Sequence, residues 1–211
     1  MNQRELDEAL LVAARRNLRE VPSLLARGAR SSADTRSEGG QDALMSAIAV
    51  GASEEASAIW LSGADASAAD ERGRTSFWWA AKKGLSDVAR LLAPASDVNK
   101  RDASGATPLI ICLANANDED DDGLACLDFL LEVCDFELSA SSAPSETPGL
   151  RCMGSMEIVE QMEASHGSAE AARRMRIAFA KSMAMSEAKC LREQIPLGGQ
   201  DAVAKPWAKA L

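Results

Sequence analysis

Glycine recurs in this chain at a nearly constant interval, and that interval limits the folds open to it. Gly40, Gly73 and Gly105 are separated by 33 and 32 residues. Other positions keep the same register: Leu44 aligns with Phe77 and Leu109, and Gly51 aligns with Gly84. A period in this range is typical of solenoids, in which copies of one supersecondary unit stack on each other.

Each unit carries signals for two short helices. A glycine at a tight turn tolerates positive φ, and Thr75 and Thr107 follow two residues later, placed to cap the first helix. Pro108 stands where a first helical residue accepts proline. Apolar spacing predicts a first helix over residues 77–83 and a second helix after Gly84. One such unit cannot bury its apolar face alone, so the units are expected to stack.

The composition agrees with an all-α fold. Hydrophobic residues make up 46% of the 211 residues, but aromatic residues only 4%, and Tyr is absent. Strands favour aromatic and β-branched residues, whereas small aliphatic residues suit close helix–helix packing.

Two segments show what the unit resembles. Residues 70–84 read Asp-Glu-Arg-Gly-Arg-Thr-Ser-Phe-Trp-Trp-Ala-Ala-Lys-Lys-Gly, and residues 102–112 read Asp-Ala-Ser-Gly-Ala-Thr-Pro-Leu-Ile-Ile-Cys. This pattern is similar to the ankyrin repeat, D-x-x-G-x-T-P-L-H-x-A-A-x-x-G. The resemblance implies an all-α ankyrin-repeat solenoid of stacked helix-turn-helix units, with four repeats at about 5–30, 40–70, 71–101 and 102–138. The first repeat is a divergent, polar cap.

The chain departs from the family pattern at several positions. The usual histidine is replaced by Met45, Trp78 and Ile110, so its hydrogen bonds between repeats are not expected. Pro94 is expected to stop the second helix of the third repeat early. Residues 30–39 form an insertion rich in Ser, Arg and Gly between the first two repeats.

The resemblance also implies a binding surface, because ankyrin repeats bind partners in a concave groove formed by turn tips and first helices. Trp79 falls on a position that the family exposes, and Arg15, Arg16, Lys82 and Lys83 bring positive charge to this face. Carried over position by position, the predicted partner-binding residues are Val12, Arg15, Arg16, Ser46, Val50, Glu71, Arg72, Arg74, Trp79, Lys82, Lys83, Ile111 and Asn115.

Charge and cysteine content limit the kinds of partner and the cellular compartment that we expect for this chain. The net charge of −9 argues against nucleic acid or an anionic membrane as the main partner. The five cysteines form no C-x-x-C pair, so reduced thiols are expected rather than disulfides or a zinc ribbon. The N-terminus lacks an apolar signal region and no apolar run could span a membrane. We therefore expect a cytoplasmic protein.

The residues needed for common catalytic sites are missing. His166 is the only histidine, and the sequence holds no phosphate-binding loop, zinc helix or dinucleotide fingerprint. Residues 118–123 resemble the start of a calcium loop, but Phe129 stands where a bidentate glutamate is needed, so a solvated acidic loop is favoured over weak calcium binding. We expect no enzyme activity, no metal or other cofactor and no small-molecule substrate.

The chain beyond residue 138 is harder to interpret. Residues 139–166 are expected to be a linker with a decayed fifth repeat, and residues 167–195 an amphipathic helix with a Met-rich stripe. That helix either closes the end of the solenoid or offers a second contact surface, and residues 196–211 are expected to be a flexible tail.

These observations leave two functional hypotheses. The leading one is a non-catalytic module that binds an acidic or amphipathic segment of a partner protein in its groove. The alternative is an acidic inhibitor or immunity-type protein that blocks a basic enzyme or toxin through its acidic surface. The sequence does not identify the partner, and it does not give the oligomeric state.

Overall fold

Four pairs of helices form the described part of the repeats. The structure, a computed structural model, describes residues 2–31, 34–116, 120–134 and 169–178. Its helices are α1 (Gln3–Arg16) with α2 (Val21–Ala26), α3 (Ala43–Ala49) with α4 (Ser53–Leu61), α5 (Ser76–Lys83) with α6 (Ser86–Leu92), and α7 (Pro108–Asn115) with α8 (Asp121–Val133). Short 3-10 turns lie at η1 (Leu18–Glu20) and η2 (Ala93–Ala95). The predicted all-α fold of helix pairs is confirmed.

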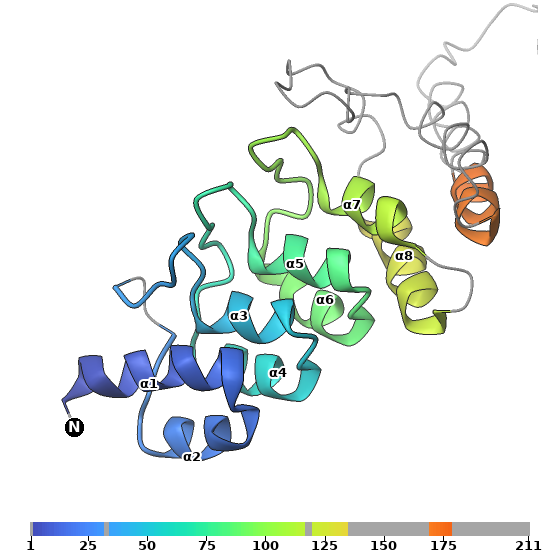
Figure 1. Ribbon diagram of the computed structural model, residues 1–211. Helices are drawn as coiled ribbons and strands as arrows, with labels where there is room; N and C mark the ends of the chain where they lie inside the picture. Colours follow the sequence, from blue (N-terminus) through green and yellow to red (C-terminus); the bar gives the residue numbers. More distant parts are fainter. Residues whose placement is uncertain (1, 32–33, 117–119, 135–168, 179–211) are drawn as a thin grey trace, which may run out of the picture. The chain divides into compact units, whose positions relative to one another are not determined.

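The pairs stack in chain order and form two layers. The first helices α1, α3, α5 and α7 contact one another in sequence, and so do the second helices α2, α4, α6 and α8. Figure 1 shows the first helices side by side, with the loops that precede them projecting to one side. Each helix layer therefore presents a row of equivalent positions along the stack.

One apolar position per repeat anchors this stack. Leu10, Leu44, Phe77 and Leu109 hold the same place in the four first helices, and each is at most 1% exposed. Alanines on the same helices, such as Ala47 and Ala80, are completely buried, which allows the helices to approach closely. The register read from the sequence therefore locates the core.

The loops before α3, α5 and α7 share one turn, and we call these loops the fingers. Gly73 N–H donates to the Asp70 carbonyl over 2.9 Å, and Gly105 N–H donates to Asp102 in the same way. Gly40, Gly73 and Gly105 all have positive φ, as the turn requires. Neighbouring fingers are joined by backbone hydrogen bonds, since Glu71 N–H donates to Gly39 and Ala103 N–H donates to Arg72.

The predicted caps are present. Thr75 and Thr107 accept hydrogen bonds from the amides of Trp78 and Ile110, and α7 begins at Pro108. In the second repeat Asp42 takes the threonine's place and accepts from the amide of Met45 over 2.8 Å. The capping position is thus filled in all three repeats that follow a finger.

Pro94 also acts as expected. Helix α6 ends at Leu92, and Pro94 lies in the 3-10 turn that follows. The proline has no amide hydrogen to continue an α-helix, so the chain leaves the second helix here.

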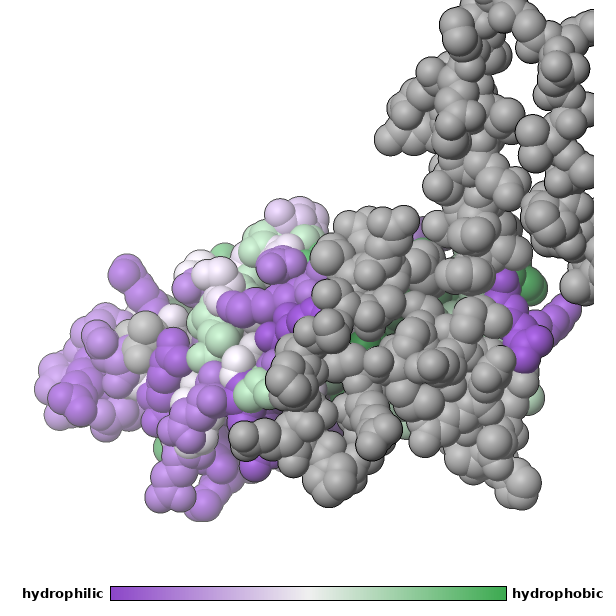
Figure 2. Space-filling view, turned by 90° about the horizontal axis from the view of Figure 1, so that it is seen from above, coloured by the Kyte–Doolittle hydropathy of each residue, from purple (hydrophilic) through white to green (hydrophobic). Residues whose placement is uncertain are grey.

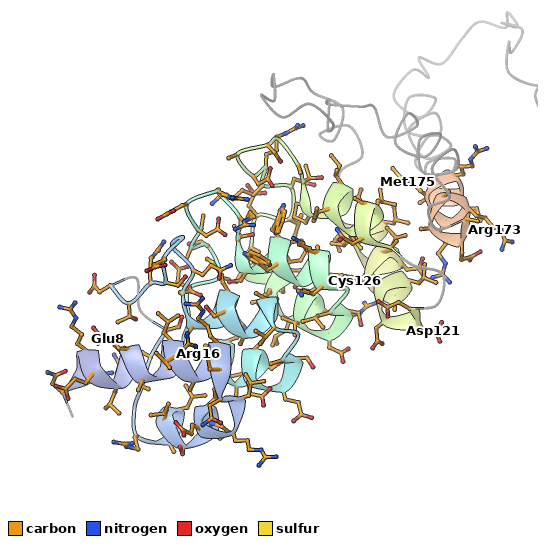
Figure 3. The ribbon with its side chains drawn as sticks, in the orientation of Figure 1. Glu8, Arg16, Asp121, Cys126, Arg173 and Met175 are labelled. Atoms are coloured by element: carbon orange, nitrogen blue, oxygen red, sulfur yellow. The ribbon has the colours of Figure 1, made fainter. Side chains whose placement is uncertain are left out.

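A further helix covers residues 169–178, coloured orange in Figure 1. Ala171, Ala172 and Met175 are buried in the same apolar cluster as the repeats, and Arg174 forms an ion pair with Asp128 of α8. Figure 3 shows Met175 on the side of this helix toward α8 and Arg173 on the opposite side. The sequence left open whether this helix closes the solenoid or offers a second contact surface, and these contacts favour closure by residues 169–178.

Several predictions concern residues outside the described part. The decayed repeat within 139–166, His166, the remainder of the Met-rich helix after residue 178 and the tail at 196–211 all lie there. Within the described ranges, no helix is both long and apolar enough to cross a membrane.

Candidate protein-interaction surface

Three positions in the second half of each first helix hold equivalent places in the repeat register, and we call them together the first-helix face. In chain order these residues are Val12, Arg15 and Arg16 on α1, Ser46, Ala49 and Val50 on or next to α3, Trp79, Lys82 and Lys83 on α5, and Ile111, Ala114 and Asn115 on α7. Since the first helices pack side by side, these residues form rows along the stack.

One row is exposed in every repeat. It consists of Arg16, Val50, Lys83 and Asn115. Val50 is 51% exposed, and Val12 on the neighbouring helix is 57% exposed. Arg15 is exposed as well, whereas Lys82 and Ile111 are half-buried. Most of the predicted first-helix residues are therefore accessible to a partner.

Two predicted contact residues are buried, which corrects the prediction. Ser46 is 1% exposed, because it lies on α3 between α1 and α5 and its side chain is too short to reach past its neighbours. Trp79 is 8% exposed, so it does not take the exposed position that the family pattern implied. Its indole packs against the finger of its own repeat instead.

The finger holds Trp79 through a buried carboxylate. Asp70 Oδ2 accepts hydrogen bonds from Trp79 Nε1 over 3.3 Å and from Arg74 Nε over 2.8 Å. Its other oxygen, Oδ1, accepts from the amides of Arg72 and Arg74 over 3.0 Å each. The Asp70 side chain is completely buried and Arg74 is 16% exposed in this pair. This network fixes the finger against α5.

Two cations lie over the tryptophans. The rings of Trp78 and Trp79 meet edge to face, with centroids 5.4 Å apart. The Arg74 guanidinium carbon lies 4.4 Å from the Trp79 centroid and 5.3 Å from that of Trp78. Lys82 Nζ lies 5.3 Å and 5.5 Å from the same two centroids. We call Arg74, Trp78, Trp79 and Lys82 the cation–indole cluster.

The sequence prediction included Arg74, Trp79 and Lys82 but missed how they combine. Trp78 was treated only as a substitute for the family's histidine. Asp70 was read as part of the repeat pattern and not as a ligand for these side chains. The signal that could have found the network is the spacing of Asp70, Arg74, Trp78 and Lys82, four residues apart, across a turn and a helix.

The finger residues named in the prediction differ in their exposure. Glu71 and Arg72 are exposed at the tip, and Arg74 is half-buried. The sequence analysis missed Arg36, whose Nη1 donates to the Ala69 carbonyl over 2.8 Å and so links the first finger to the next. This hydrogen bond thus fixes the position of one finger relative to the finger of the following repeat.

Charge is distributed unevenly between the two helix layers. Arg15 and Arg16 lie in the last turn of α1, and Lys82 and Lys83 in the last turn of α5. The first turns of α4, α6 and α8 are acidic, with Glu54, Glu55, Asp87, Asp121 and Asp122. Both arrangements complement the helix dipoles, a favourable effect of about 0.3–1 kcal/mol per charge.

Burial and hydrogen bonding shift some pKa values. Burial raises the pKa of Asp42, although the hydrogen bond from Met45 opposes it. Hydrogen bonds from Ser67 lower the pKa of Asp65. The side-chain hydrogen bond with Cys126, and burial, raise the pKa of Cys112. Figure 3 shows Cys126 inside the stack, and Cys112, Cys126 and Cys134 are buried free thiols, as expected.

The prediction of a solvated acidic loop is wrong for the described part of the segment that resembles a calcium loop, because residues 121–123 begin helix α8. Asp120 caps α8 by accepting a hydrogen bond from the amide of Gly123, and Asp121 and Asp122 are exposed in its first turn. Phe129 is buried at 8% exposure. Among the residues that the structure describes, no group of three metal-ligating side chains is close enough to hold an ion.

Comparison with known proteins agrees with this architecture. The family model for ankyrin repeats, in three copies, matches residues 51–140. No curated protein matches the chain. Ankyrin repeats generally mediate protein–protein interactions. The helix pairs, the fingers and this match together show that residues 51–140 are ankyrin repeats within an all-α solenoid.

Proposed function

We propose that this chain is a non-catalytic interaction module, and that it binds a partner protein through the first-helix face and the tip residues Glu71 and Arg72. In this proposal residues 1–138 form the interaction domain, residues 139–166 link it to the helix at 167–195, and residues 196–211 form a tail. The protein works in the cytoplasm without a cofactor.

The charge of the first-helix face carries this proposal. The chain has 32 acidic and 23 basic residues, yet the first-helix face holds four basic residues and none that is acidic. The exposed valines Val12 and Val50 lie on adjacent helices of the same face. A basic, partly apolar strip on an acidic protein favours an acidic or amphipathic segment as its partner.

The view in Figure 2 agrees with recognition by charge. The coloured part of the face seen there is mostly hydrophilic, with small hydrophobic areas. A partner that depended on one large apolar patch would find little to bind there.

Partner capture with a pair of matched variants tests the proposal. Val50→Glu places an acid on the first-helix face, and Leu61→Glu makes the same kind of change at the end of α4, where Leu61 is 76% exposed. Both variants are compared with the unaltered chain by affinity capture from native lysate and mass spectrometry. Circular dichroism verifies that all three fold.

We expect Val50→Glu to lose partners that Leu61→Glu retains. Interface positions in the centre of a contact often cost more than 2 kcal/mol, or about 30-fold in affinity, when a charge of the wrong sign is introduced. Equal capture by both variants would reject binding through the first-helix face.

The inhibitor hypothesis has one observation in its favour. The exposed acids Glu54, Asp87, Asp121 and Asp122 lie at the starts of successive second helices. A basic enzyme could bind this acidic row in place of its own anionic ligand. Asp121→Lys together with Asp122→Lys would then abolish capture while Val50→Glu preserved it, which is the reverse of the result expected above.

A further inference from the structure

The cation–indole cluster has more hydrogen-bond donors than acceptors. Both oxygens of Asp70 are fully used, since each accepts two hydrogen bonds. Among the described residues, Arg74 donates to Asp70 through Nε only, which leaves its two outer guanidinium nitrogens for another acceptor. Asp70 is the one carboxylate paired with this cluster in that part of the chain.

Lys82 adds a second positive charge without a partner of its own. Within the described ranges, no carboxylate lies within ion-pair distance of its ammonium group, which rests over the two rings. Trp78 Nε1 is buried and has no hydrogen-bond acceptor among the described residues, although Trp78 is only 4% exposed. Counted together with Asp70, the cluster therefore carries one more positive than negative charge, and Lys82 and Trp78 Nε1 have no acceptor among the described residues.

Arg74 and Lys82 each lie within 5.5 Å of both ring centroids, and like charges this close to the same rings repel each other. Asp70 forms an ion pair with Arg74, and an anion that reached Lys82 as well would offset this repulsion. The indole faces attract both cations, by about 0.5–1 kcal/mol for each exposed cation. A second carboxylate would remove the repulsion and satisfy the donors that remain. Arg is well suited to such a ligand, because its planar fork matches the geometry of a carboxylate.

The cluster lies where a partner could reach it. Lys82 is half-buried at the end of α5, next to the exposed Lys83, and Arg74 belongs to the finger that carries the exposed Arg72. Glu71 is the acidic residue on the same finger tip, and it is exposed. α5 contacts α3 on one side and α7 on the other, so the cluster is central in the described stack.

We propose that an aspartate or glutamate of an acidic partner segment binds the Lys82 ammonium and the outer guanidinium nitrogens of Arg74, above Trp78 and Trp79. This assignment rests on the proposed function, and it names the chemistry of the partner at the third repeat. The indoles hold both cations in place before the partner arrives, which lowers the entropy cost of ordering them.

A defined peptide probe tests this site on the full chain. The probe is a fluorescein-labelled dodecapeptide of alternating Glu and Ala, and its control has Gln in place of Glu. Fluorescence anisotropy measures the affinity for the unaltered chain, for Lys82→Gln and for Lys82→Arg. Arg4→Gln is the matched control, because it removes one positive charge from α1, where the Arg4 side chain is 77% exposed and distant in sequence from the cluster.

We expect the glutamate peptide to bind, with an affinity that falls as salt is added, and the glutamine peptide not to bind. Lys82→Gln should weaken binding about fivefold, the upper end for one exposed ion pair. Lys82→Arg should restore it, and Arg4→Gln should leave it unchanged. Equal loss for Lys82→Gln and Arg4→Gln would show attraction by net charge alone and would overturn the site.

Partner capture separates failure of this site from failure of the proposed function. If Val50→Glu loses the natural partner and Lys82→Gln does not, the first-helix face binds without the carboxylate site, and the inference is wrong. If neither variant loses the partner, the proposed function itself fails. Loss with both variants, together with the peptide result above, supports both proposals.

Discussion

Gly51 and Gly84 follow the first helices of successive repeats with the same left-handed backbone, but their surroundings differ. Their φ values are +85° and +68°. A Cβ at Gly51 would meet nothing within 4 Å, whereas a Cβ at Gly84 would lie 2.8 Å from Cα of Gly123 in α8. A Gly-to-Ala substitution at Gly51 therefore measures the cost of the left-handed backbone alone. The same substitution at Gly84 measures that cost together with the cost of the close contact with α8.

Gly84→Ala should therefore destabilise the protein more than Gly51→Ala. The left-handed conformation costs about 1–2 kcal/mol at either position. The contact with Gly123 should add about 1–3 kcal/mol at Gly84, because backbone must move to admit the methyl group. Urea denaturation of both variants measures the difference. Equal losses would mean that the α5–α6 turn does not pack on α8 as closely as described.

Asp42 should make stability depend on pH. Burial raises its pKa in the folded state, so the folded protein holds the proton to a higher pH than the unfolded chain does. The stability contributed by this group is then present at low pH and is lost as pH rises through the folded-state pKa.

Asp42→Thr should remove this loss, because the threonines at the equivalent positions of α5 and α7 cap without a charge. The variant should gain stability relative to the unaltered chain as pH rises from 4 toward 7. Urea denaturation at several pH values measures the gap. A gap that stays constant or narrows with rising pH would contradict the assignment.

Single residues also show the limits of prediction from sequence. The caps Thr75, Thr107 and Pro108 were predictable, because a cap depends on residues two or three positions away. The burial of Trp79 was not, because it depends on Asp70 and Arg74 in the finger and on the packing of α5 between its neighbours. The repeat register predicts where the backbone of a residue lies. Whether its side chain is exposed depends also on the size of that side chain and on its hydrogen bonds.

At the scale of elements, the fingers of the third and fourth repeats share a turn but differ in what their aspartates hold. Asp70 and Asp102 each accept hydrogen bonds from backbone amides of their own turn. Asp70 also binds the Arg74 side chain and the Trp79 indole. Among the described residues, the side-chain partner of Asp102 is the hydroxyl of Ser104, and Asp102 binds no cation or indole there. The finger of the third repeat is therefore tied to its helix by a buried ion pair.

Asp70→Ala should cost more stability than Asp102→Ala. Removing one partner of a buried ion pair costs about 3–5 kcal/mol, because it leaves the other charge unpaired. Losing hydrogen bonds to neutral donors at Asp102 should cost about 1–3 kcal/mol. Thermal and urea unfolding of the two variants give both values. A larger loss at Asp102 would show that the cation–indole cluster does not hold the finger of the third repeat.

The helix at residues 169–178 contributes to the stack through one face. Met175 is 1% exposed and Ile177 is 46% exposed, so the two positions form a matched pair on one helix. Met175→Ala should cost about 2–5 kcal/mol, as expected for a buried core residue. Ile177→Ala should stay within about 0.5 kcal/mol. Urea denaturation of both variants gives these values, and similar effects would mean that the helix does not cap the repeats.

Some features of the helices could be predicted from the sequence and others could not. The helix pairs followed from the period of 33 and 32 residues, since repeats impose their own register. Docking of residues 169–178 on α8 depends on Arg174 and Asp128, which are 46 positions apart. No period connects those residues, so the sequence left open whether this helix caps the solenoid or binds a partner.

At the scale of the whole molecule, stacking converts a repeated sequence into a repeated surface. The same register that buries Leu10, Leu44, Phe77 and Leu109 exposes Arg16, Val50, Lys83 and Asn115. The core row is apolar in every repeat because it serves packing, whereas the exposed row changes in size, polarity and charge from repeat to repeat. A row of differing side chains along the stack gives a solenoid an extended binding surface.

Hydrogen–deuterium exchange of the full chain, with and without the captured partner, tests this account most directly. If the first-helix face is the interface, binding should slow exchange in peptides that cover residues 8–17, 44–51 and 77–84, with the strongest protection around Lys82. The starts of α4, α6 and α8 should exchange as before. Protection confined to residues 53–57, 86–90 and 120–125 would place the partner on the acidic second helices and contradict the proposed function.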